Sequence, residues 1–550
     1  METISLSGDR VKYLVFEGGG GLGMVYLGAI EALEDVLARD RNLAGRRHVE
    51  FPDRLFPIWG DGPIEGRPFR GVCGASAGAI TAFMLAIGMD SYEIDQALAE
   101  LHPVIIDPGG LKDDSQELWS AAENFFDSPD PVTARVFRPK EIGEPRSTYK
   151  WENKPEVLTI LKKWGRGFVA DTLHQYFFPF TKPLRRSYSI VKRLLLLGDL
   201  NSERQLSIGF APNPLGIVPP VLPYPTTRPV EFKHHDNAAT YLHSLLLNRG
   251  LFSGVAAREF FRRLIKERLP AAHFKAHKGA VPLDPDMSFM EFYNVTGVDL
   301  VVTGVNISRR EPRYFSVWHT PNFPVVEAVA LSMSIPLVFK PMYIEGGVRK
   351  GDTPQNIAYQ GLYVDGGMLN NYPVRAFDTI EKRNTLSNGE PLRYRNVDVG
   401  TFGGVFIAVD PREGTGGNEP FLGFRLVDMG RPNVPPDQEQ VVEPSIKFDD
   451  IFSSGGNARV GIDLIKDLFY TFLYPANSGQ VRYANDRSRT IPLNVHGLDL
   501  LDFAHPDADL YNKKTKVLLV DGVPRTIALD EWKRGRRNEA RTRVESRVRQ

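Results

Sequence analysis

A strand, a glycine-rich turn and a helix follow one another twice near the start of this chain. In the first unit, an apolar run at residues 13–16 leads into the glycines at 18–21, and apolar residues at helical spacing predict a helix over residues 24–37. The second unit covers residues 71–87. Repetition of this unit predicts an α/β fold with a mainly parallel central sheet, whose functional groups lie at the carboxyl ends of the strands.

The second unit places one serine between two glycines, in Gly74-Ala75-Ser76-Ala77-Gly78. A serine on a sharp turn between a strand and an alanine-rich helix is how many hydrolases present a nucleophile. The motif alone is weak evidence, because Gly74 and Gly78 would also serve close packing of a helix on a sheet. Ser76 further needs a base within hydrogen-bond reach to take its proton.

The sequence offers two kinds of base for Ser76. His496 and His505 lie late enough in the chain for an aspartate–histidine pair in the order found in α/β-hydrolases, but neither lies in a glycine-rich turn. Asp365 does, since it follows an apolar strand and precedes Gly366-Gly367. The glycines allow close approach and unusual backbone angles, and partial burial would strengthen the carboxylate as a base. We therefore predict a Ser76–Asp365 dyad.

The negative oxygen of a tetrahedral intermediate needs hydrogen-bond donors, and the first glycine turn can supply them. Gly18, Gly19, Gly20, Gly21 and Gly23 can direct backbone N–H groups toward one point at the start of a helix, where the helix dipole also favours an anion. The alternative for such a turn is a dinucleotide or phosphate site. The sequence lacks a convincing acidic residue after a second strand to hold a ribose.

Composition excludes several classes of protein. The 550 residues carry 67 basic and 67 acidic side chains, so no net charge attracts nucleic acid. The single cysteine, Cys73, excludes an internal disulfide framework and a multi-cysteine zinc site, and we expect it to be a buried core thiol. The histidines show no ligand spacing, so we expect no metal and no cofactor.

The predicted location follows from what the chain lacks. Its first residues show no secretory signal, and no uncharged apolar run is long enough to span a bilayer. We expect a soluble, cytoplasmic protein that meets lipid from outside, and delivery outside the cell without a classical signal peptide stays open. Residues 182–197 mix basic residues with leucines, which suits an amphipathic lipid-binding segment and a solvated charged face equally, whereas the arginine-rich tail at 533–549 favours a solvated face.

The order of segments predicts a core interrupted by an insertion. We assign residues 1–106 and 250–410 to the core, 107–249 to a partly helical insertion that acts as a lid or as a regulatory or membrane element, and 411–550 to an extension that completes the core and ends in a basic helix. Within the later segments we expect the following: a strand at 299–305 with a hairpin partner at 315–318, helices at 254–269 and 325–334, a strand at 405–409, a glycine- and proline-rich link at 410–444, a helix near 458–473 and a strand near 490–495.

With these residues in view, the chain resembles the patatin-like phospholipases. That family carries a glycine-rich oxyanion loop, a Gly-x-Ser-x-Gly turn and an Asp-Gly-Gly or Asp-Gly-Ala turn, in the order found here. Further similarity lies in Ser332-Met333-Ser334-Ile335-Pro336 and Asn370-Asn371-Tyr372-Pro373. The resemblance covers roughly residues 11–106 and 250–410, with weaker agreement to about 520.

The resemblance implies a three-layer α/β/α fold and a Ser–Asp acyl hydrolase that needs no metal for bond cleavage. Its substrate would be a phospholipid, a lysophospholipid or another lipid ester, reached through transient contact with a membrane surface. The resemblance leaves open the sn-1 or sn-2 preference and any protein or small-molecule activator. One departure is Leu22, which stands where the family usually has Arg or Lys. Leu22 is also the main support for the alternative, a catalytically silent module that grips a nucleotide or a partner protein.

Overall fold

The computed structural model describes residues 4–6, 11–38, 54–57, 68–105, 116–126, 133–137, 150–153, 245, 249–273, 284–321, 323–344, 359–377, 421–429, 484–520 and 523–549. The predicted strand at 405–409, the predicted helix near 458–473, residues 182–197 and most of the 107–249 insertion lie outside this set. Among the described helices, none combines the length and the apolar character that crossing a bilayer requires.

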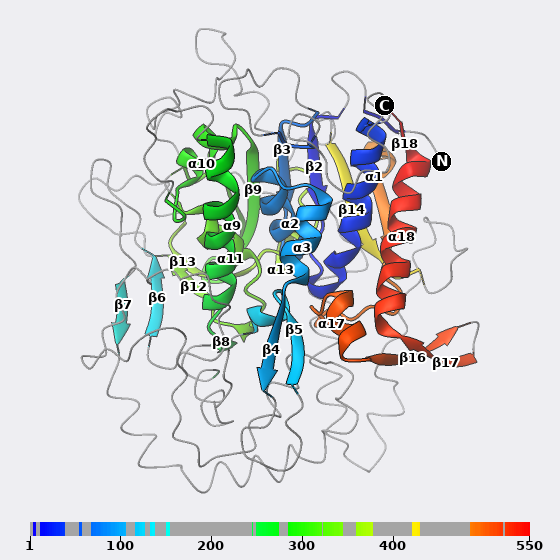
Figure 1. The fold of residues 1–550 in the computed structure, drawn as a ribbon. Coiled ribbons are helices and arrows are strands. Elements are labelled where there is room, and N and C mark those ends of the chain that lie inside the picture. Colours follow the sequence, from blue (N-terminus) through cyan, green and yellow to red (C-terminus); the bar gives the residue numbers. More distant parts are fainter. Residues whose placement is uncertain are drawn as a thin grey trace, which may run out of the picture.

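A ten-stranded sheet forms the centre of the molecule, in the order β15-β14-β2-β3-β9-β13-β12-β6-β7, with β10 paired to β9 (Figure 1). Neighbours in its first half run parallel. These strands are β15 (Thr490–Asn494), β14 (Phe421–Val427), β2 (Tyr13–Phe16), β3 (Gly71–Gly74) and β9 (Asp299–Asn306). β2, β3 and β9 are buried along their whole length, as expected for parallel strands covered on both faces.

The second half of the sheet is mixed. β13 runs antiparallel to β9 and to β12, β6 runs parallel to β12, and β7 and β10 form antiparallel pairs with β6 and β9. These strands are β13 (Gly361–Asp365), β12 (Met342–Ile344), β6 (Thr133–Phe137), β7 (Lys150–Asn153) and β10 (Glu311–Phe315). The α/β class is therefore confirmed, but the strand that ends in Asp365 does not belong to the parallel block.

Helices cover one face of the sheet. Figure 1 shows α1, α2, α9, α11 and α18 in front of the strands. The described helices are the 3-10 turns η1 (Gly20–Val25) and η4 (Glu123–Phe125), and α1 (Tyr26–Ala38), α2 (Ala77–Ala86), α3 (Ser91–Ala99), α9 (Val255–His273), α10 (Phe289–Thr296), α11 (Val325–Ser332), α13 (Gly367–Asn370), α16 (Ala484–Ser488), α17 (Pro506–Tyr511) and α18 (Leu529–Arg547). On the opposite face, the ring of Phe377 stacks on that of Tyr13 with centroids 4.0 Å apart.

Short strand pairs lie outside the main sheet. They are β1 (Ile4–Ser5) with β18 (Val548–Arg549), β4 (Leu101–Ile105) with β5 (Gln116–Ser120), β8 (Gly250–Phe252) with β11 (Leu337–Phe339), and β16 (Thr515–Val520) with β17 (Val523–Ala528). The first pair joins the two described ends of the chain, which lie side by side in Figure 1.

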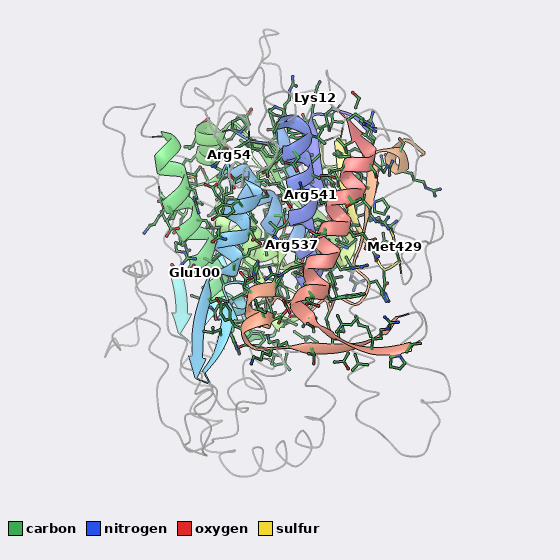
Figure 2. The ribbon with its side chains drawn as sticks, turned by 45° about the vertical axis from the view of Figure 1, so that its right-hand side comes forward. Lys12, Arg54, Glu100, Met429, Arg537 and Arg541 are labelled. Carbon is green, nitrogen blue, oxygen red and sulfur yellow. The ribbon has the colours of Figure 1, made fainter. Side chains whose placement is uncertain are left out.

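The arginine-rich tail is part of the core structure and not only a solvated face. It forms α18, which packs along α1 and buries Ala540 and Val544. The helices approach so closely that a Cβ atom on Gly28 would lie 2.0 Å from a backbone oxygen of α18. Arg541 pairs with Glu31 of α1 at 2.8 Å, and Figure 2 shows Arg541 along the contact of the two helices. The charge of the tail is thus largely matched by acidic neighbours.

Three further expectations need correction. The predicted link at 410–444 contains β14, a buried strand beside β2, because the apolar run Phe421–Val427 is flanked by the glycines and prolines that suggested a link. The hairpin partner of β9 is Glu311–Phe315, before the predicted 315–318, because the turn after β9 is short. The helix expected from Met24 begins as the 3-10 turn η1 and becomes α-helical at Tyr26.

The remaining tested elements agree with the sequence. The helix expected at the end of the 71–87 unit, the helices expected at 254–269 and 325–334 and the strand expected near 490–495 form with small shifts of their ends. Cys73 is fully buried within β3, as predicted, and burial raises the pKa of its thiol. The limits proposed for the insertion and the extension stay predictions, although β6 and β7 show that residues 133–137 and 150–153 contribute strands to the main sheet.

Candidate active site

Ser76 lies on a strained turn between β3 and α2. Its backbone angles, φ 50° and ψ −122°, fall in a region that residues other than glycine rarely adopt. The turn is tight because a Cβ atom on Gly74 would lie 2.2 Å from the backbone of Gly78, and one on Gly78 would lie 2.4 Å from the carbonyl oxygen of Phe16. The two glycines therefore let α2 start directly against the sheet, with Ser76 as its N-terminal boundary.

Asp365 ends the strand β13, which runs antiparallel to β9, and it lies at the same end of the sheet as Ser76. In the parallel pair of β3 and β9, Gly74 stands opposite Val302, and β9 continues beyond the end of β3. β13 runs antiparallel to this continuation and pairs Asp365 with Gly304. Gly304 follows Val302 by two residues, as Ser76 follows Gly74. Both residues therefore stand at the same edge of the sheet.

The end of α11 links the two turns. The backbone N–H of Ser76 donates to the hydroxyl of Ser332 at 3.0 Å, and the N–H of Gly366 donates to the carbonyl of Ser332 at 3.2 Å. The N–H of Asp365 donates to the carbonyl of Ser334 at 2.9 Å. Ser332 thus binds the turn of the predicted nucleophile, residues 74–78 (the nucleophile turn), with its side chain, and the turn of the predicted base, residues 365–367 (the base turn), with its backbone.

The carboxyl group of Asp365 is completely buried, and this burial raises its pKa to about 7. The hydroxyl of Ser76 and the N–H of Gly367 act in the opposite direction and lower that pKa. Oδ1 accepts from Gly367 at 2.6 Å, whereas Oδ2 has no hydrogen bond of ordinary geometry within the described residues. A carboxylate with this pKa can accept a proton near neutral pH, and Oδ2 is the atom available for it.

Gly366 is required by space and not by an unusual backbone angle. Its φ of −63° and ψ of −27° are ordinary helical values, contrary to the expectation from the sequence. A Cβ atom there would lie 2.1 Å from the hydroxyl oxygen of Thr303 on β9. The absence of a side chain lets the base turn pack directly on the neighbouring strand.

Residues 18–23 form the glycine loop, and only some of its amides are unoccupied. The N–H of Gly18 donates to the carbonyl of Asn371 at 2.9 Å, and the N–H of Gly21 donates to the carbonyl of Leu500 at 2.8 Å. Within the described part of the chain, the N–H groups of Gly19 and Gly20 have no such acceptor. These two amides are therefore the ones that can bind an added anion.

The glycine loop runs across the nucleophile turn. A Cβ atom on Gly18 would lie 3.0 Å from the Cβ of Ser76, and one on Gly23 would lie 2.8 Å from the Cβ of Ala77. Gly23 thus serves close packing. Asn371 ties the loop to the segment after Asp365, since its side-chain amide donates to the carbonyl of Gly18 at 3.0 Å.

The two histidines considered as bases have other partners. Nδ1 of His496 lies 2.8 Å from Asp428, and Nε2 of His505 lies 2.8 Å from Asp95. Nδ1 of His505 accepts the backbone N–H of Asp507 at 3.2 Å. Neither imidazole is placed to take a proton from Ser76 in this arrangement.

A sequence model of the family described as patatin-like phospholipase matches residues 14–378. The chain belongs to the patatin-like phospholipase family. This membership confirms the resemblance seen in the three turns and supports a lipid hydrolase. It covers the glycine loop, the serine turn and the aspartate turn, but ends before β14, β15, α17 and α18.

Individual relatives match over short stretches or with low similarity. The chain is 24% identical over 102 residues to the "Probable lipid hydrolase 463L" of Invertebrate iridescent virus 6, and 31% identical over 80 residues to the "Uncharacterized protein R571" of Acanthamoeba polyphaga mimivirus. These stretches are 18% and 14% of this chain and 30% and 22% of the relatives. The chain thus spans less than a third of either relative.

Two solved structures are also similar. VipD from Legionella pneumophila shares 14% identity, with a TM-score of 0.31 over 98% of this chain and 67% of VipD. ExoU, solved in complex with SpcU from the type III secretion system of Pseudomonas aeruginosa, shares 14% identity, with a TM-score of 0.19 over 63% of this chain and 46% of that chain.

Leu22 takes no part in charge interactions of this patatin-like site. Its side chain is 3% exposed and belongs to the hydrophobic core, so it cannot replace the basic residue usual at this position of the family. No pattern in the sequence points to Leu500, which binds the glycine loop from a distant part of the chain. Ser332 and Asn371 lie in segments that resemble the family, and only the structure shows what they contact.

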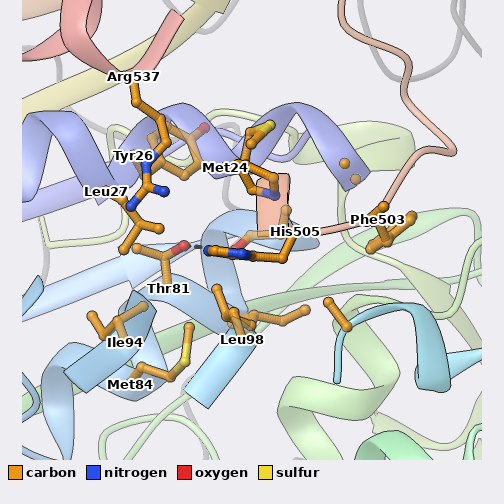
Figure 3. A pocket seen from close by; sticks show the side chains of 18 of the residues that line it. Met24, Tyr26, Leu27, Thr81, Met84, Ile94, Leu98, Phe503, His505 and Arg537 are labelled. Atoms are coloured by element: carbon orange, nitrogen blue, oxygen red, sulfur yellow. Dashed lines mark hydrogen bonds between the residues drawn. The ribbon is translucent and has the colours of Figure 1, made fainter. Parts of the chain in front are cut away.

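An apolar cavity of about 80 Å³ adjoins the glycine loop. Figure 3 shows Met24 and Leu27 on one side and Met84 and Leu98 on the other, with His505 between the two groups. Gly20, Gly21, Gly23 and Ala77 also line it, so it starts beside the nucleophile turn. Across the described residues, no three His, Cys, Asp or Glu side chains are grouped to hold a metal ion, and the expectation of a metal-free, cofactor-free site stays a prediction.

Proposed function

We propose that this protein is a lipid acyl hydrolase of the phospholipase A or lysophospholipase type, with Ser76 as nucleophile and Asp365 as base. The observation that carries the proposal is the meeting of Ser76, on its strained turn, with a fully buried carboxyl group whose pKa is about 7. The pKa of an ordinary exposed aspartate is about 3.9, which makes it a much weaker base.

The reaction follows from the contacts of the two residues. The hydroxyl oxygen of Ser76 attacks the ester carbonyl while its proton passes to Oδ2 of Asp365. The oxyanion is held by the amides of Gly19 and Gly20, joined by the amide of Ala77, which as the first residue of α2 has no acceptor within its helix. The protonated Asp365 then gives its proton to the leaving alcohol. In the second half, Asp365 takes a proton from water, which attacks the carbonyl carbon of the acyl-enzyme. The bond from that carbon to the Ser76 oxygen then breaks, the oxygen takes back the proton from Asp365, and the fatty acid is released.

The cavity beside the glycine loop supports an acyl group as the bound part of the substrate. It is lined mainly by apolar side chains and begins at Ala77, next to Ser76. An apolar cavity of this kind stays dry and takes apolar groups, and one of about 150 Å³ is known to hold benzene. The volume here suits the end of an acyl chain, and transient contact with a membrane surface, from which the lipid is drawn, is part of the proposal.

Release of fatty acid from phospholipid vesicles tests the proposal. We expect the Ser76→Ala and Asp365→Asn proteins to fold as the wild type does and to release no fatty acid above background. His496→Gln is the matched control, because its imidazole contacts Asp428 and not the site, and it should keep wild-type activity. Full activity in either dyad variant would refute the assignment. A wild type that binds vesicles without hydrolysis would instead favour the silent binding module suggested by Leu22.

A further inference from the structure

The 499–504 segment packs against the glycine loop. The carbonyl of Leu500 accepts the N–H of Gly21 at 2.8 Å. A Cβ atom on Gly20 would lie 2.3 Å from that carbonyl oxygen, and one on Gly21 would lie 2.0 Å from the carbonyl oxygen of Asp502. The backbones therefore touch directly, so a shift of the 499–504 segment would move the loop or open a gap beside it.

A buried lysine of α18 holds this segment in place. Nζ of Lys533 lies 2.9 Å from Oδ2 of Asp502 and donates to the carbonyl of Ala504 at 2.8 Å. The other oxygen of Asp502 accepts the N–H of Ala504 at 3.1 Å. Nζ also lies 2.6 Å from Asp509 of α17. One ammonium group thus joins α17, α18 and the 499–504 segment.

Because this cluster of charged side chains is buried, its members cannot move apart without a large cost in free energy. Lys533 is 1% exposed, Asp509 is fully buried and Asp502 is 6% exposed. Lys514 continues the cluster, since its Nζ lies 3.2 Å from Asp509 and 3.3 Å from Glu123. Buried charges are costly unless each one is paired in good geometry, so displacement of one member is strongly opposed by the others.

Asp502, Asp509, Lys514 and Lys533 lie outside the part of the chain that matches the family, which ends at residue 378. We propose that Asp502 and Lys533 are positioning residues for catalysis, because their buried ion pair fixes the 499–504 segment that sets the glycine loop at the distance from Ser76 needed to bind the oxyanion. Neither side chain touches the substrate. The inference rests on the proposed function. If Asp502 and Lys533 act in this way, the active site is incomplete without the carboxyl-terminal part of the chain.

The test combines kinetics with hydrogen exchange in the full-length chain. Asp502→Asn keeps the shape of the side chain but removes the charge that pairs with Lys533. We expect kcat per active site, counted by titration with a fluorophosphonate, to fall about tenfold to a hundredfold with KM little changed, because small displacements in an active site have effects of this size. Amide exchange in the peptide containing residues 17–25 should become several-fold faster.

The matched control is Arg541→Gln, which removes the ion pairs from the same helix, α18, to Glu31 and Asp35 of α1 without touching the 499–504 segment. It should leave both kcat per titrated site and the exchange of residues 17–25 unchanged. A purely structural role of Asp502 would lower the melting temperature or the titrated fraction, with wild-type kcat per site and wild-type exchange, and would overturn the proposal.

The experiment distinguishes failure of the proposed function from failure of the positioning role of Asp502. If the wild type hydrolyses no lipid, the proposed function fails, and the exchange experiment alone still decides whether Asp502 holds the loop. If Asp502→Asn does not fold, Asp502→Glu keeps the charge and lengthens the side chain by one methylene, which shifts the segment against the loop. The same loss of kcat per site is then expected, and wild-type values would contradict the proposal.

Discussion

At the scale of the residue, Asp365 fixes how activity should depend on pH. Its pKa of about 7 means that the carboxyl group is protonated, and cannot act as a base, at lower pH. We expect kcat/KM for a soluble ester to rise with pH through about 7 and then to level off. A profile that is flat from pH 5 to 9 would contradict the role of this carboxyl group.

The same pKa also predicts the direction of a stability effect. The unfolded chain loses the proton of Asp365 near pH 3.8, whereas the folded protein holds it to about pH 7. The unfolded state therefore binds fewer protons between these values, so this residue makes the free energy of unfolding fall as the pH rises from about 4 to 7. Asp365→Asn removes that part of the pH dependence, which urea unfolding at a series of pH values measures.

The backbone of Ser76 predicts a conflict between stability and activity. Glycine adopts a φ of 50° without strain, whereas alanine is as strained there as serine. We expect Ser76→Gly to be about 1 kcal/mol more stable than Ser76→Ala. The backbone strain of about 1–3 kcal/mol that glycine relieves at position 76 exceeds the extra conformational entropy that glycine loses on folding. Both variants lack the hydroxyl, so the comparison isolates the backbone. Equal unfolding free energies in urea would contradict strain at this turn.

Local patterns singled out the two residues of the proposed dyad, because each lies in a turn defined by its own neighbours. Ser76 and Asp365 could be singled out from the glycines around them, and so could the glycine loop. Ser332 and Leu500 could not be assigned, because each acts through a contact between segments far apart in the sequence. The availability of Gly19 and Gly20, as opposed to Gly21, likewise depends on such a contact.

At the scale of the element, the parallel half of the sheet was predictable except for β14, and the direction of β13 was not. Apolar runs that enter glycine turns identified β2 and β3, but such a pattern carries no information on direction. The missed strand β14 shows another limit. Its seven residues are apolar enough to be recognised, yet the glycines and prolines on both sides outweighed them.

Helix α2 carries the residues that should set the preference for acyl-chain length. Ile80 lines the cavity beside the glycine loop. Ile80→Phe narrows the cavity, and we expect it to raise the ratio of kcat/KM for short over long p-nitrophenyl esters by about tenfold, as the fit of one or two methylenes is worth 1–3 kcal/mol. Ile80→Ala should shift the ratio the other way. A loss of stability alone affects both esters equally, so an unchanged ratio in both variants would exclude this cavity as the acyl site.

At the scale of the whole molecule, the region matched by the family is not a complete structure. β14 pairs with β2 along its length, and the side chain of Glu17 accepts the N–H of Leu426 at 2.7 Å. α18 covers α1 on the same side of the molecule. Amino-terminal and carboxyl-terminal parts of the chain therefore share one core.

A truncated chain tests this dependence. Residues 1–378 lack β14, β15 and α18, which leaves the fully buried strand β2 as an open edge and uncovers the apolar face of α1. We expect this fragment to aggregate or to show no cooperative thermal unfolding, in contrast to the full chain. A folded and active fragment, measured by circular dichroism and vesicle hydrolysis, would show that the carboxyl-terminal part is dispensable.

The most direct test of the account is labelling with a fluorophosphonate, followed by mass spectrometry of the labelled peptide. The reagent reacts with a serine hydroxyl only when that hydroxyl is activated. We expect a single label at Ser76 in the wild type and at least a hundredfold slower labelling in Asp365→Asn. Labelling of Ser76 at the wild-type rate in Asp365→Asn, or no labelling of Ser76 in the wild type, would contradict the dyad.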